Sequence, residues 1–162
     1  MKPFKTLLTI LVISLLSSPS WSETIGDLVQ REGIYYKQFT DVPFSGKVTG
    51  GQQGSLKNGR KDGAWVGYWS NGQLSYKENY KNGKEDGAWV HYWSNGQLWF
   101  EQNYKNGKKD GVFVSYWTNG QLNYKGNFKN DMREGAWVTY KSSGTVDKGW
   151  TGTYKDGVKI SD

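Results

Sequence analysis

Residues 62–85 read DGAWVGYWSNGQLSYKENYKNGKE, residues 86–109 read DGAWVHYWSNGQLWFEQNYKNGKK, and residues 110–133 read DGVFVSYWTNGQLNYKGNFKNDMR. A fourth copy begins with EGAWVTYK at residues 134–141. The acidic residue that opens each copy recurs every 24 residues, at Asp62, Asp86, Asp110 and Glu134. A fixed period of this length is typical of repeat architectures, in which one supersecondary unit stacks on its neighbours. The pattern therefore predicts the shape of the molecule but does not indicate which ligand it binds.

The turn signals inside each copy predict paired strands. Asn-Gly occurs twice in 24 residues, first at Asn71-Gly72 and Asn82-Gly83, and it lies between aromatic and β-branched runs. Asn-Gly at such a place favours a two-residue hairpin turn, because both residues tolerate a positive φ. Helical periodicity is absent. We therefore expect an all-β fold, an elongated single-layer antiparallel meander of stacked β-hairpins.

Two-residue turns would also assign the faces of the sheet. Such a loop at Asn71-Gly72 would place Trp69 opposite Leu74, and one at Asn82-Gly83 would place Tyr76 opposite Trp89. One face would then carry Trp65, Trp69, Leu74, Tyr76 and Tyr80. The other would carry Val66, Tyr68, Val90, Tyr92, Trp99, Val114 and Tyr116.

The chain divides into three parts. Residues 1–22 are predicted to be a signal peptide, because Lys2 and Lys5 precede a short apolar run and small residues precede Glu23; an uncleaved anchor is the alternative. Residues 23–53 are a lead-in, with a hairpin around Glu32-Gly33, although a short helix at 24–30 is an alternative there. Residues 54–158 are the repeat array: a degenerate first repeat (54–61), three full repeats (62–85, 86–109, 110–133) and a capping repeat (134–158).

Composition and charge narrow the function classes. Of the 162 residues 16% are aromatic, which favours a folded chain, and the absence of Cys excludes disulfides and thiolate chemistry. The formal net charge is +6, but acids and bases alternate in the turns, which is typical of a solvated rim. We expect no nucleic-acid partner, and a mild attraction to anionic envelope lipid or polysaccharide.

Catalytic and metal-binding signals are weak. His91 is the only histidine, and its repeat equivalents are Gly67, Ser115 and Thr139, so we interpret it as a surface residue. Asp62, Asp86 and Asp110 are each isolated beside Lys, which favours a local turn-forming role over a calcium site. We expect no enzyme activity, no cofactor and no metal.

The aromatic side chains are the binding candidates. Rows of identical residues recur along the repeats and could stack sugar rings, hold cations or receive peptide side chains. A core role is the more economical interpretation for the Trp row, whereas the Tyr row is better placed to be exposed. The candidate residues are Tyr68, Tyr92, Tyr116, Trp99, Trp69, Trp93 and Trp117.

The segment YKNGKEDG at residues 80–87 resembles the core of the MORN repeat. The segment YWSNGQL at residues 68–74 and 92–98 resembles the bacterial MORN-repeat variant family, whose members are often labelled YwqK-type antitoxins. The resemblance is strong over residues 54–140. It implies an elongated twisted sheet that contacts proteins or membranes, with lipid binding in some relatives. An antitoxin would act in the cytoplasm, which disagrees with the predicted export signal.

Three functions follow as hypotheses. The first is an exported scaffold, periplasmic or secreted, that binds an unidentified protein partner. The second is a cell-wall or carbohydrate-binding protein that uses its aromatic rows. The third is a protein that neutralises a partner toxin.

Overall fold

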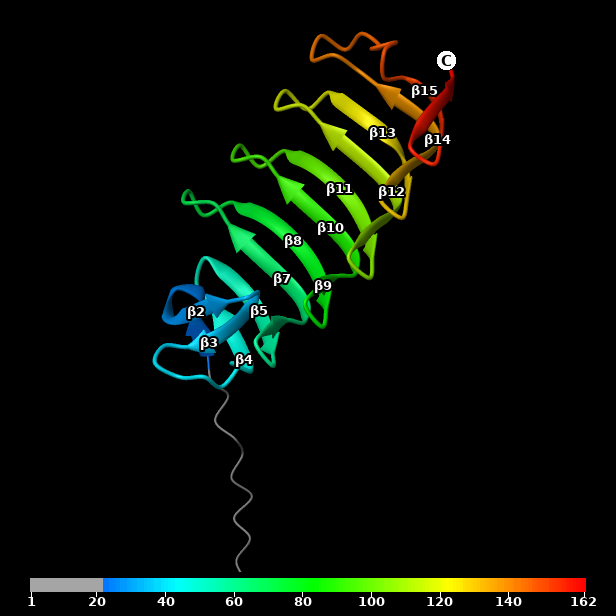
Figure 1. Ribbon diagram of the computed structural model, residues 1–162. Coiled ribbons are helices and arrows are strands. Elements are labelled where there is room, and N and C mark those ends of the chain that lie inside the picture. The colour runs from blue at the N-terminus through cyan, green and yellow to red at the C-terminus, as the bar shows by residue number, and fades with distance from the viewer. Residues whose placement is uncertain (1–21) are drawn as a thin grey trace, which may run out of the picture.

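The computed structural model describes residues 22–162, which form a long curved sheet of successive hairpins (Figure 1). The predicted signal peptide lies outside the described residues, except for Ser22. Within the described part, the main sheet has 14 strands in the order β1-β4-β5-β7-β8-β10-β11-β12-β13-β14-β15-β16, with β6 paired to β5 and β9 paired to β8. The predicted all-β meander is confirmed for the repeats.

The strands of the repeat array are between 2 and 9 residues long. They are β5 (Gln52–Lys57), β6 (Arg60–Lys61), β7 (Gly63–Tyr68), β8 (Leu74–Lys81), β9 (Lys84–Glu85), β10 (Gly87–Tyr92), β11 (Leu98–Lys105), β12 (Lys108–Tyr116), β13 (Leu122–Lys129), β14 (Met132–Thr139), β15 (Gly152–Lys155) and β16 (Val158–Ser161). The N-terminal elements are β1 (Ser22–Thr24), the 3-10 helix η1 (Ile25–Asp27), β2 (Leu28–Arg31), β3 (Ile34–Lys37) and β4 (Gly46–Thr49).

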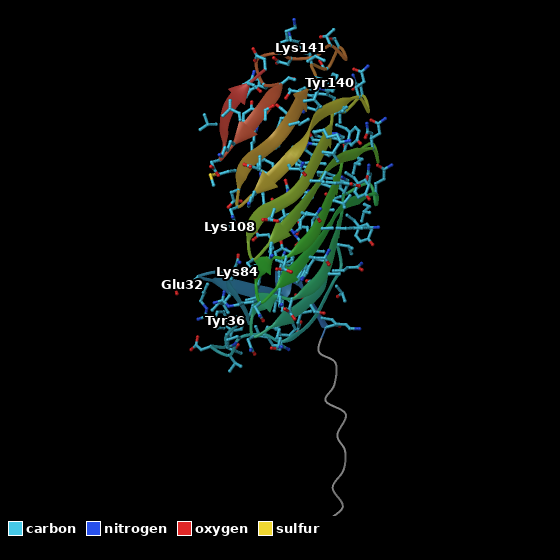
Figure 2. All side chains as sticks on the ribbon, turned by 90° about the vertical axis from the view of Figure 1, so that its right-hand side faces the viewer. Glu32, Tyr36, Lys84, Lys108, Tyr140 and Lys141 are labelled. Atoms are coloured by element: carbon cyan, nitrogen blue, oxygen red, sulfur yellow. The ribbon has the colours of Figure 1, made fainter. Side chains whose placement is uncertain are left out.

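One edge of the array consists of tight turns. Asn82 and Gly83 have φ values of 52° and 82°, and Lys81 pairs directly with Lys84. This is the two-residue turn that the sequence predicts, because both central residues adopt the left-handed region. Lys84 and Lys108 lie along this edge in Figure 2.

The opposite edge consists of longer loops, and here the predicted turn is wrong. The backbone N–H of Trp69 donates to the carbonyl of Gln73 (2.8 Å), and Tyr68, not Trp69, pairs with Leu74. Only Gly72 of the Asn71-Gly72 pair has positive φ. The loop is therefore wider than two residues, and the sheet register shifts between Gly67 and Tyr68.

A second register shift separates successive hairpins. Tyr76 pairs with His91 instead of Trp89, because the chain breaks its pairing between β9 and β10 at Gly87, whose φ is 103°. The predicted pairing is wrong by two residues. An even shift keeps every side chain on the same face, since strand side chains alternate with a period of two.

The N-terminal lead-in adds a second layer. The predicted hairpin at Glu32-Gly33 is confirmed as β2 and β3, which form a separate two-stranded sheet. Its residue Leu28 joins Phe44, Val48, Leu56 and Trp65 in a buried cluster. The repeats form a single layer, and the lead-in covers this end of it to make an apolar core of two layers.

Successive repeats are joined by hydrogen bonds from their loops. The indole Nε1 of Trp69 donates to the carbonyl of Tyr92 (3.2 Å), and Asn71 Nδ2 donates to the carbonyl of Ser94 (2.9 Å). The same pair of bonds recurs one and two repeats further on. The loops thus form a ladder along one edge of the sheet.

The acidic residues that open the repeats form hydrogen bonds along the other edge of the sheet, where the tight turns lie. Asp62 Oδ1 accepts a hydrogen bond from the backbone N–H of Asn82 (2.9 Å), and Asp86 does the same for Asn106 (3.1 Å). The predicted local turn role is wrong for these two residues. Each carboxylate instead holds the tight turn near the end of its own repeat.

Candidate functional site

The two faces of the repeat sheet differ in chemistry. The aromatic face carries Trp65, Trp89, Phe113 and Trp137 at one repeat position, together with the side chains that oppose them. The valine–tyrosine face carries Val66, Tyr68, Val90, Tyr92, Val114 and Tyr116. Strand alternation separates the two sets, since Trp65 is buried and the neighbouring Val66 points the other way.

The predicted candidate residues fall into separate groups. Tyr68, Tyr92 and Tyr116 end strands on the valine–tyrosine face, and Tyr68 is 42% exposed. Trp69, Trp93 and Trp117 begin the wide loops, where their indole nitrogens are used in the inter-repeat ladder. The Trp row therefore has a structural role in holding repeats together.

Trp99 lies on the aromatic face, so its predicted place beside the tyrosines is wrong. Its ring centroid is 4.6 Å from that of Trp93 and 6.2 Å from that of His91. The cause is the register shift between His91 and Tyr92, which leaves Trp99 as the extra residue of a bulge. It is 38% exposed.

His91 also differs from expectation, because it is packed into the aromatic face. Its ring stacks against Tyr76 (5.6 Å between centroids) and Phe100 (4.4 Å). Its Nε2 lies 3.1 Å from Glu78 Oε1, which makes an ion pair when the imidazole is protonated. The interpretation of His91 as a surface residue is therefore wrong.

Glu78 is the centre of a polar cluster at this end of the face. It is buried, it accepts a hydrogen bond from the Tyr80 hydroxyl (2.8 Å), and Lys61 Nζ lies 3.8 Å from its Oε2. Burial, followed by the nearby Glu78 carboxylate, raises the pKa of Tyr76 to about 12. Burial also raises the pKa of Tyr80 and lowers the pKa of Lys61. A buried carboxylate here is thus balanced by groups of the chain itself.

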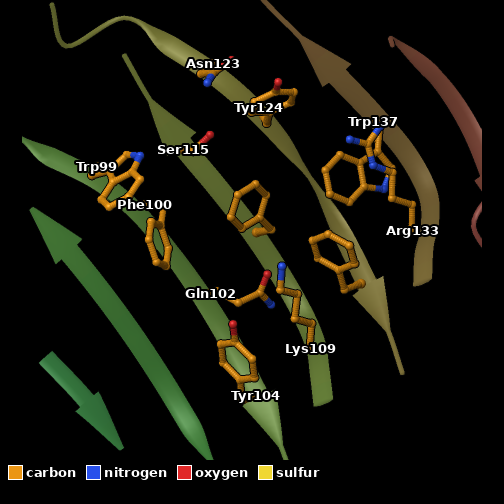
Figure 3. Close-up of a pocket in the computed structure, with 12 residues that line it drawn as sticks. Trp99, Phe100, Gln102, Tyr104, Lys109, Ser115, Asn123, Tyr124, Arg133 and Trp137 are labelled. Carbon is orange, nitrogen blue, oxygen red and sulfur yellow. The ribbon is translucent and has the colours of Figure 1, made fainter. Parts of the chain in front are cut away.

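Further along the aromatic face is a hollow of about 370 Å³ (Figure 3). Trp99 and Phe100 lie on one side of it, and Arg133 and Trp137 on the other. The remaining lining residues are Gln102, Tyr104, Lys109, Phe113, Ser115, Asn123, Tyr124 and Phe128. Clefts of this size, mostly apolar with a few polar groups, are typical of small-ligand sites.

Both ends of the aromatic face are covered by the chain. At the N-terminal end β2 and the segment before β4 pack over Trp65. At the C-terminal end Arg133 lies 4.5 Å from the Trp137 ring and 5.5 Å from the ring of Trp150, in the segment between β14 and β15. The hollow is in the part of the face between these two coverings.

Sequence reasoning missed most residues of the hollow, although the repeat carries a signal. Aligned copies show Trp, Trp, Phe and Trp at residues 65, 89, 113 and 137. The position opposite holds Glu78, Gln102, Gly126 and Gly152. The change at Phe113 marks the place of the hollow, but its surroundings depend on the register shifts.

Comparison with known families identifies the repeats. Residues 61–82, 85–106 and 109–130 each match the family model described as MORN repeat variant. These three consecutive matches show that residues 61–130 are repeats of the MORN repeat variant type, as the sequence resemblance implies. A comparison with curated proteins finds no relative that matches this chain.

Over residues 22–162, no helix is long and apolar enough to span a bilayer. In the same range, no group of three or more His, Asp or Glu residues is arranged to hold a metal ion.

Proposed function

We propose that this protein is an exported, non-enzymatic scaffold that binds another protein through its valine–tyrosine face. MORN repeats mediate contacts with proteins and membranes, which is consistent with a scaffold. The supporting observation is the unequal covering of the two faces. The buried cluster at the N-terminal end includes Trp65, Tyr76 and Tyr80, but no residue of the valine–tyrosine face.

The exposed face has the chemistry of an interaction surface. Tyr68 is exposed, Tyr92 and Tyr116 are half-buried, and the valines between them are half-buried as well. Val66 opposes Lys77, Val90 opposes Glu101 and Val114 opposes Lys125, so charges of both signs flank the apolar row. Tyrosine combines a large apolar ring with a hydroxyl, and it is enriched at protein interfaces.

The test is a pull-down from detergent-solubilised envelope with the tagged protein as bait. A second bait carries Tyr68→Ala, Tyr92→Ala and Tyr116→Ala. A control bait carries Lys84→Ala and Lys108→Ala, which change exposed side chains on the tight-turn edge. We expect one stoichiometric protein that the wild type and the lysine control retain and the tyrosine variant loses. Retention of lipid or polysaccharide without any protein would contradict the scaffold and favour polymer binding.

Export is tested separately by fractionation of cells and sequencing of the mature N-terminus. We propose that cleavage precedes Glu23, so the mature chain should begin there and should be found in the periplasm or the medium. A cytoplasmic protein that retains residues 1–22 would contradict export and would restore the toxin-neutralising alternative.

A further inference from the structure

The hollow on the aromatic face has a specific structural origin, the substitution of one indole by a smaller ring. Trp65, Trp89 and Trp137 each direct Nε1 to the carbonyl ten residues earlier, at distances of 3.2, 3.2 and 3.1 Å. Phe113 occupies the same repeat position but has no such donor and a smaller ring. Space that an indole fills in the other repeats is therefore open beside Phe113, where the hollow lies.

Gln102 replaces the missing donor. Its Nε2 donates to the carbonyl of Asn103 (2.7 Å), which is the repeat equivalent of the carbonyls that the tryptophans use. This bond fixes the orientation of the amide and leaves Oε1 buried, with no hydrogen-bond partner. Gln102 is only 2% exposed, so its unpaired carbonyl oxygen is costly unless a donor reaches it.

Two further polar atoms of the hollow are also buried without a hydrogen-bond partner within residues 22–162. Ser115 Oγ and Asn123 Oδ1 are buried without a partner among the described residues, and Ser115 is 4% exposed. Both residues line the hollow together with Gln102 (Figure 3). The site therefore offers several hydrogen-bonding oxygens between aromatic walls.

The hollow also holds two cations that have no carboxylate. Lys109 Nζ lies 5.0 Å from the Phe128 ring, and Arg133 Cζ lies 4.5 Å from the Trp137 ring. Neither forms an ion pair with any residue in the range 22–162.

At the N-terminal end of the array, the lysine at the equivalent position has a carboxylate partner. Lys61 is the repeat equivalent of Lys109, it lies 4.8 Å from the Tyr80 ring, and it is paired with Glu78. Gly126 occupies the repeat position of Glu78 in the third full repeat, so that position supplies no carboxylate. Within the described part of the chain, Lys109 therefore lacks the ion-pair partner that Lys61 has.

We propose that the hollow binds a carboxylated sugar, a uronate unit of an acidic polysaccharide. Its ring hydroxyls would donate to Gln102 Oε1 and Asn123 Oδ1, and its carboxylate would lie between Lys109 and Arg133. Its C–H faces would lie on the aromatic walls. A peptide end also carries a carboxylate, but it supplies one backbone N–H per residue, whereas one sugar ring supplies several hydroxyl donors. This site lies on the opposite face from the proposed protein-binding surface and is independent of it.

The test is calorimetric titration of the purified protein with trigalacturonic acid. Neutral galactotriose and a glutamate-rich tripeptide are the comparison probes. The key variant is Phe113→Trp, which restores the side chain found at the equivalent position of three other repeats and is therefore compatible with the fold. Lys109→Gln removes one cation of the site. Lys108→Gln is its matched control, because Lys108 is the neighbouring residue and is exposed.

We expect the wild type and Lys108→Gln to bind trigalacturonic acid equally, and galactotriose much more weakly. Lys109→Gln should weaken binding by about tenfold, the loss of one charge-assisted contact. Phe113→Trp should abolish binding while its melting temperature stays at or above that of the wild type. Absence of binding by the wild type, or equal binding by Phe113→Trp, would overturn the proposal. Preference for the acidic peptide would overturn the sugar and assign the hollow to a polypeptide.

Discussion

Trp65 and Phe113 occupy the same position of the repeat, yet their surroundings are opposite. Trp65 is fully buried, because the β2–β3 hairpin lies over it and because Lys61 is paired with Glu78 beside it. Phe113 lines an open hollow with an unpaired lysine and an unpartnered glutamine oxygen. The difference shows that one position of the repeat can lie in a core or line an open hollow, depending on the ring it carries and on what covers it.

The largest expected effect concerns the covering layer. Trp65→Ala should reduce the free energy of unfolding by about 3–5 kcal/mol, because it removes a fully buried indole from a two-layer core. Trp89→Ala, at the same repeat position in the uncovered middle, should cost about half as much, since that indole is only half-buried. Urea denaturation followed by circular dichroism measures both. Equal losses would show that the hairpin adds nothing to the core.

An intermediate effect concerns pH at the covered end. The pKa of Tyr76 is raised from 10.0 to about 12, so its contribution to stability is fully present below pH 10 and is lost as the pH rises towards 12. Wild type should therefore lose about 1 kcal/mol more than Tyr76→Phe between these pH values, after allowance for partial exposure. Thermal melts of both proteins from pH 8 to pH 12 measure the difference. Parallel curves throughout would show that burial of Tyr76 does not shift its titration.

The smallest expected effect concerns the loop ladder that both regions share. Asn95 donates from Nδ2 to the carbonyl of Thr118, and its Oδ1 accepts from the backbone N–H of Gln97. Asn95→Asp keeps the acceptor and removes the donor, so it should cost about 0.5–1 kcal/mol of unfolding free energy. Asn95→Ala should cost more, because it also loses the local turn bond. Denaturation of the two variants in parallel measures each step. No loss in Asn95→Asp would show that the inter-repeat bond contributes nothing, and equal losses in the two variants would show that the local turn bond contributes nothing.

The repeat period and the tight turns could be predicted because they depend on local chemistry. Asn82 and Gly83 both adopt the positive φ that this dipeptide favours, and the hairpin at Glu32-Gly33 follows the same rule. Asn71-Gly72 could not be predicted from the dipeptide alone. Its loop is set by the bonds of Trp69 and by the bond of Asn71 to the following repeat, contacts that exist only once repeats are stacked.

The sequence predicts the candidate site in part. Trp99 is a predicted binding residue and lines the hollow, but its predicted face is wrong, because one bulge residue reverses the alternation. The sequence does not predict Phe113, Gln102 or Lys109 as site residues. Each is unremarkable in the linear sequence and becomes significant only by comparison with its equivalents in the neighbouring repeats.

The all-β repeat array, its period and the residues at its tight turns can be read from the chain alone, because they follow from side-chain alternation and backbone preference. Which aromatic side chains belong to the core and which line the hollow depends on the folded structure. That difference depends on two things that a linear pattern does not contain. They are the register shifts between hairpins, which bring His91 opposite Tyr76, and the folding of the N-terminal hairpin over Trp65.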